Sequence, residues 1–130
     1  MKYKKDPTAG LRLLALCSPF SPAQAVDIHL NVRARFDALR KGLGTTDDFN
    51  ELAVAMNMAS EFVNGKSPFA EKIAADAVDA LNRAKDRHTR LGVWGLDGPG
   101  MQALDFGIDL HEQIIDNATP AQILPTVRAA

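Results

Sequence analysis

The sequence predicts an all-α protein, a single-domain bundle of four main helices with short helical segments at its ends. Apolar residues recur at spacings of three and four in four successive segments, which is the period of an amphipathic helix. Each of these segments is bounded by helix start and stop residues. No stretch shows the alternation of apolar and polar residues that marks a half-buried strand. A chain of 130 residues is long enough for one domain with its own core.

The first main helix is predicted to begin at Ser21 and to end at Gly42. Ser21 is a typical N-cap, Pro22 suits the first helical position, and Gln24 can bond back to the backbone of the cap. The face that we expect to be buried comprises Ala25, Ile28, Val32, Phe36, Leu39 and Leu43.

The second helix is predicted to start where Thr45 or Thr46 can act as the cap. Asp47 and Asp48 follow, and their negative charge favours the N-terminal end of a helix. Asn64 ends the helix. Its expected buried face comprises Phe49, Leu52, Met56, Ala59, Phe62 and Val63.

The third helix repeats the combination of cap and proline at Ser67 and Pro68. It is rich in alanine, which predicts that a neighbouring helix packs closely against it. Its expected face comprises Ile73, Ala77, Leu81, Ala84, His88 and Leu91.

A glycine-rich connection from Gly92 to Gly100 is predicted to lead into the fourth helix, which Pro99 can open. Gly107 lies inside this helix and indicates either a close contact between helices or a kink, and Asn117 is its expected end. The expected apolar positions are Met101, Leu104, Ile108, Leu110, Ile114 and Ile115.

The two ends of the chain carry weaker signals. Thr119 is predicted to start a short helix that Pro125 ends, and residues 11–17 suit either a short helix or an extended cover. Residues 1–10 and 125–130 are expected to be flexible.

Composition favours a cytoplasmic protein. Cys17 is the only cysteine, so no intramolecular disulfide can form, and a small buried apolar role suits it better than a catalytic thiolate. The apolar stretch that it ends is too short for a membrane span, and Ser18 and Pro19 interrupt the pattern of a signal peptide.

The histidines do not follow a known metal-binding pattern. His29, His88 and His111 fall on three different predicted helices, and His111 lacks the second histidine of an H-E-x-x-H zinc motif. The sequence therefore predicts no structural metal and no cofactor, and it points to no catalytic residue.

Four carboxylates form an acidic stripe along one face of the fourth helix: Asp105, Asp109, Glu112 and Asp116. Such a stripe suits a solvated face, a metal site, or a docking surface for basic residues. The net charge is +3 before residue 91 and −4 after it. The stripe is therefore predicted to meet a basic surface, in the same chain, in a second copy or in another protein.

Trp94 is the only tryptophan and lies in the glycine-rich connection. Tryptophan is enriched at the energetic centres of interfaces, so Trp94 is a candidate for partner binding. The alternative is that its ring folds back and plugs the end of the bundle.

Basic residues crowd the end of the third helix, where Arg83, Arg87 and Arg90 share a face and are candidate nucleic-acid contacts. The dipole of the helix also favours cations at this end without any partner. A net charge of −1 and a pI of about 6.3 do not match a dedicated nucleic-acid binder.

A resemblance rests on the opening residues 4–11 and on residues 14–20, together with the segment Asp47 to Leu52. These stretches resemble small accessory proteins from phage and plasmid regions of proteobacteria. The resemblance implies a cytoplasmic bacterial protein of mobile-element origin that acts on host machinery by binding.

The sequence thus favours a non-catalytic protein-binding or regulatory module, with another protein or a second copy as the partner and without membrane association. A nucleic-acid-binding transcriptional regulator is the alternative, and a metal-binding or enzymatic bundle is the third possibility.

Overall fold

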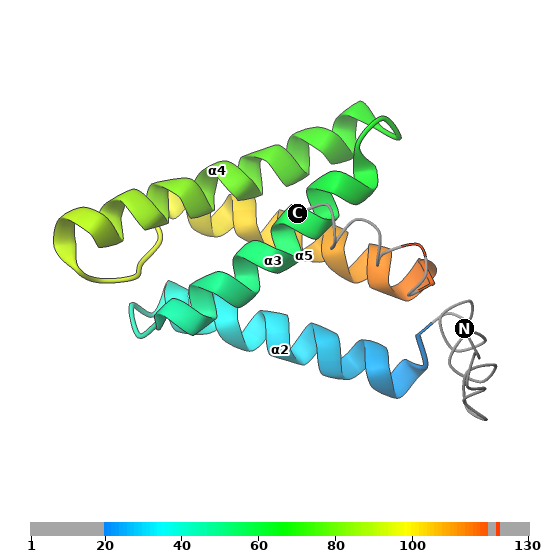
Figure 1. Ribbon diagram of the computed structural model, residues 1–130, viewed down its shortest axis with the longest axis horizontal. Helices are drawn as coiled ribbons and strands as arrows, with labels where there is room; N and C mark the ends of the chain where they lie inside the picture. The colour runs from blue at the N-terminus through cyan, green and yellow to red at the C-terminus, as the bar shows by residue number, and fades with distance from the viewer. Residues whose placement is uncertain (1–19, 120–121, 123–130) are drawn as a thin grey trace, which may run out of the picture.

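The computed structural model describes residues 20–119 and residue 122, and it has the all-α architecture expected from the sequence. Four helices follow one another: α2 (Pro22–Arg40), α3 (Thr46–Val63), α4 (Pro68–Leu91) and α5 (Gly98–Asn117). In Figure 1, α4 and α2 lie at the top and bottom of the bundle, with α3 crossing in front and α5 behind. Within the described part of the chain, only an isolated bridge between Gly44 and Trp94 has strand character.

Local capping explains why the helices begin where they do. The Ser21 hydroxyl accepts a hydrogen bond from the Gln24 backbone amide, and the Gln24 side-chain oxygen accepts one from the Ser21 backbone amide. Thr45 and Asp48 form the same reciprocal pair at the start of α3. Each pair satisfies amides that the first turn of a helix leaves without a partner.

Proline and aspartate open the other two helices. Ser67 caps α4 ahead of Pro68, and α4 ends at Gly92, whose φ of +74° suits glycine. Asp97 caps α5 by accepting from the Gly100 amide at 2.6 Å, a role that the sequence interpretation assigned to no residue.

The core runs through the centre of the bundle. Its fully buried large side chains come from α2, α3 and α5, and α4 contributes mainly alanines. Of the two alternatives predicted for Gly107, the close contact between helices is confirmed, since a Cβ atom on Gly107 would lie 2.6 Å from the Cβ of Ala77 on α4. The large side chains with less than 2% exposure are Leu39, Leu52, Met56, Leu104 and Ile108.

The expectation of burial is wrong for two residues of the predicted faces, because both are exposed. Leu43 is 74% exposed because α2 ends at Arg40 and the chain turns before Leu43 can continue the apolar face. Leu91 is 61% exposed because it is the last residue of α4, beyond the reach of the neighbouring helices.

The terminal predictions fall largely outside the described residues, which exclude 1–19, 120–121 and 123–130. At the second end, the Thr119 side chain accepts from the Gln122 amide, and Gln122 accepts from the Thr119 amide, which is the predicted helix-start pairing. The described helices include none that is long and apolar enough to cross a bilayer.

Candidate functional site

The acidic stripe faces an arginine of the same chain. The Arg33 guanidinium on α2 donates to Asp105 at 2.7 Å, to Asp109 at 2.6 Å and to Glu112 at 2.7 Å. The fourth carboxylate, Asp116, lies 2.8 Å from Nε2 of His29. The charge asymmetry left open whether the basic surface facing the stripe belongs to the same chain, to a second copy or to another protein. The structure places such a basic residue, Arg33, in the same chain.

This arrangement changes the electrostatics of Arg33. Partial burial lowers its pKa, but hydrogen bonds to Asp105, Glu112 and Asp109 outweigh that effect, so the pKa is raised and the guanidinium stays charged. The single cation also relieves the repulsion among three carboxylates at helical spacing. The stripe therefore fastens α2 to α5, and the charge that it offers to an external partner is reduced.

Two histidines lie beside this network. His111 on α5 is only 3% exposed, and His29 on α2, which contacts Asp116, is near enough for its charge to act on His111. The Nδ1 atoms of both rings are buried and have no hydrogen-bond partner among the described residues. Within the same residues, no group of three or more histidine, cysteine or carboxylate side chains is placed to hold a metal ion.

We expect the buried His111 to make the fold sensitive to acid. Burial, and secondarily the charge of His29, lowers the pKa of His111 from 6.5 to about 4. The neutral ring stabilises the fold fully above pH 6.5, and that stability is lost as the pH falls through 4, because the unfolded chain takes up the proton first. The loss should approach about 3 kcal/mol, at ~1.4 kcal/mol per unit of pKa difference.

The measurement is urea unfolding of the wild type and of His111→Leu between pH 7 and pH 4. Leucine cannot bind a proton, so the difference in unfolding free energy between the two proteins should shift in favour of the variant as the pH falls. A difference that stays constant with pH would contradict the assignment to His111.

The Trp94 ring packs against its own chain at the end of the bundle. Its ring is 9% exposed and lies between Phe49, with ring centroids 4.3 Å apart, and His88, with centroids 3.9 Å apart. Its Nε1–H donates to the Thr46 hydroxyl at 3.2 Å. Because the ring is enclosed by its own chain, the folded-back alternative describes Trp94, and the ring offers little surface to a partner.

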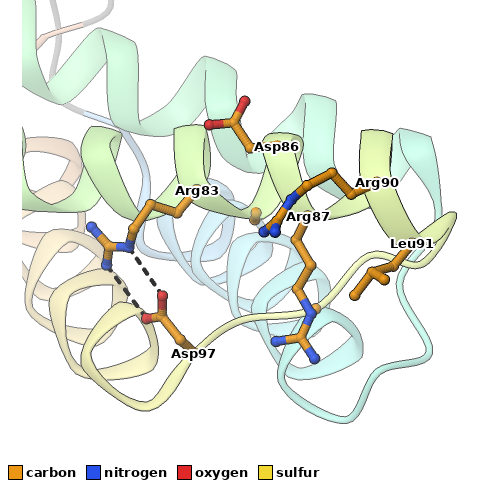
Figure 2. Close-up of a pocket in the computed structure, with 8 residues that line it drawn as sticks. Arg83, Asp86, Arg87, Arg90, Leu91 and Asp97 are labelled. Carbon is orange, nitrogen blue, oxygen red and sulfur yellow. Dashed lines mark hydrogen bonds and ion pairs between the residues drawn. The ribbon is translucent and has the colours of Figure 1, made fainter.

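The arginines of α4 lie around a hollow between the last turns of that helix and the 92–97 connection (Figure 2). Arg83 pairs with Asp97 through two contacts, of 3.0 Å and 3.4 Å. The hydrogen bond from Arg83, and then the one from the Gly100 amide, lowers the pKa of Asp97. We call this feature the arginine hollow; besides Arg83 and Asp97, it is lined by Ala84, Asp86, Arg87, Arg90, Leu91 and Gly95.

An apolar groove on the outer side of α4 and α5 was missed in the sequence interpretation. Phe69 is 77% exposed and Phe106 is 53% exposed, although both are large aromatic residues. The sequence contained a signal for Phe106, which falls outside the apolar spacing of its own helix. We call this feature the α4–α5 groove; its lining residues are Phe69, Ala70, Ile73, Phe106, Asp109, Leu110 and Gln113.

The fold and these surfaces define a small helical bundle that carries an apolar groove and a basic hollow. Comparison with protein-family models, with curated proteins and with solved structures finds no significant match to the chain.

Proposed function

We propose that this protein is a protein-binding module that pairs with a second copy of itself through the α4–α5 groove. The observation that carries the proposal is the exposure of Phe69 and Phe106 beside one apolar groove. A large aromatic side chain contributes about 150–250 Å² of mostly apolar surface when it is buried. Contiguous apolar patches of this kind on a folded protein mark interaction sites.

The charges along the edge of the groove favour a second copy. Along α4, Lys72 lies near the Phe69 end of the groove and pairs with Asp76 at 3.2 Å on the exposed surface, and Asp76 and Asp79 line a second hollow that also contains Phe106. In the proposed dimer, a two-fold axis passes beside Phe106, so the α4 helices of the two copies lie side by side and run antiparallel. Lys72 of each copy then faces Asp79 of the other, so the same face supplies both halves of the charge pair.

The first test is the mass of the purified protein in solution. We expect sedimentation equilibrium to give a dimer at tens of micromolar, and Phe106→Asp to shift it to a monomer because a charge would be buried in the apolar contact. Val54→Asp is the matched control, since Val54 is 58% exposed on α3 and lies outside the groove. A wild-type protein that remains monomeric at several hundred micromolar would refute self-pairing.

A charge swap tests the orientation of the two copies. Lys72→Glu and Asp79→Lys should each weaken the dimer, because each homodimer then holds two like-charged pairs. An equimolar mixture of the two variants should recover the dimer, because both contacts between unlike copies are again complementary. If the mixture is as weak as the separate variants, the antiparallel arrangement is wrong.

A further inference from the structure

We propose that the arginine hollow binds a small phosphate monoester, with Arg87 and Arg90 holding the phosphate and Leu91 contacting the organic group. The proposal concerns the end of α4 and is independent of pairing through the α4–α5 groove. It rests on three observations: the cations that remain unneutralised, their position around one hollow, and the apolar wall beside them.

The anionic side chains of the hollow form no ion pair with these two arginines, although the charge of Arg87 does act on Asp97. The Asp97 carboxylate accepts hydrogen bonds from both Arg83 and the Gly100 amide, so both of its oxygens already have a partner. Asp86 also lines the hollow, and in the view of Figure 2 its carboxylate points away from the guanidinium groups of Arg87 and Arg90. Among the described residues, no carboxylate forms an ion pair with Arg87 or Arg90.

The position of the arginines is not explained by the helix alone. The dipole of α4 favours a cation at Arg90, which lies in the last turn, but its effect falls off within that turn. Arg87 precedes the last turn, and Figure 2 shows its side chain reaching toward the 92–97 connection. Arg90 extends back along α4 toward Arg87, and both line the same hollow.

The chemistry of the lining selects the ligand. Guanidinium groups bind phosphate through paired, charge-assisted hydrogen bonds, and two of them match the double negative charge of a monoester. The exposed Leu91 side chain supplies an apolar surface for the remainder of the molecule. The hollow measures about 330 Å³, a size that suits a small molecule. A net charge of −1 gives the chain no general attraction for a nucleic-acid backbone.

Calorimetric titration of the 130-residue chain with phenyl phosphate and with inorganic phosphate tests the site. We expect saturable binding of both ligands, with phenyl phosphate several-fold tighter. Arg87→Gln and Arg90→Gln should each weaken both ligands about tenfold or more. Leu91→Ser should remove only the preference for the phenyl ester. Lys85→Gln is the matched control, because it removes a positive charge from the same stretch of α4 outside the hollow.

Several results would overturn the proposal. One is the absence of saturable binding by the wild type, and another is an equal loss of affinity in Lys85→Gln. Amide shifts in a titration followed by NMR must be largest at residues 87–97, and a maximum elsewhere would place the ligand at a different site. A single-stranded oligonucleotide that binds more tightly than phenyl phosphate, with affinity rising with its length, would identify a nucleic-acid surface instead.

Discussion

Gly107→Val is expected to lower the free energy of unfolding by about 3 kcal/mol, the upper end of what overpacking costs in a well-packed core. Even a Cβ atom at this position would lie 2.6 Å from the Cβ of Ala77 and 2.8 Å from Sδ of Met56. The methionine can move aside, but the alanine Cβ is fixed to the backbone of α4. Valine must therefore push α5 away from α4 at the point where three helices meet.

Thermal and urea unfolding measure the effect, and Gly98→Val is the control. Gly98 begins the same helix, and nothing lies within 4 Å of the position of its Cβ. A double-mutant cycle with the milder Gly107→Ala locates the clash. Ala77→Gly should destabilise the Gly107→Ala protein less than it does the wild type, with a coupling energy of about 1 kcal/mol. Additive effects of the two substitutions would show that the contact with Ala77 is not the cause.

Trp94→Ala is expected to cost about 3–5 kcal/mol of stability, as is usual when a buried aromatic side chain is removed from a core. The substitution deletes two stacking contacts, with Phe49 and His88, and the hydrogen bond to Thr46. A domain of this size is stable by about 5–15 kcal/mol, so the variant should unfold at a much lower urea concentration.

The neighbouring Val93→Ala provides the comparison for Trp94. Val93 is 52% exposed, so its truncation should change stability by no more than about 0.5 kcal/mol. The two interpretations of Trp94 from the sequence differ in the expected result. If Trp94→Ala keeps the stability of the wild type but loses binding to a partner, the ring is an interface anchor and its role as a plug is refuted.

The helices were predictable because their signals are local. A cap such as Ser21 or Thr45 acts on amides within three residues, and the apolar period repeats within each helix. Gly107 is also a local signal, since a glycine inside an otherwise good helix must have a packing reason or a cost. The sequence could indicate that reason, but it could not name Ala77 as the neighbour.

The surfaces were less predictable because they depend on which helices become neighbours. The acidic stripe was visible in the sequence, but its counter-ion, Arg33, lies 72 to 79 residues away from the carboxylates that it binds. The exposed aromatic groove needs Phe69 and Phe106 to be brought together from separate helices. No periodicity within one helix contains that information.

The sequence by itself determined the all-α class, the starts of the helices and most of their buried faces, because capping and amphipathicity act between residues a few positions apart. Only the tertiary structure decided that Trp94 is enclosed, that the acidic stripe is paired with Arg33 of the same chain, and that an aromatic groove and two arginines remain exposed. The physical reason is that burial and charge pairing depend on distances between helices. Those distances are set by close packing of the whole core, here at the contact of Gly107 with Ala77 and Met56.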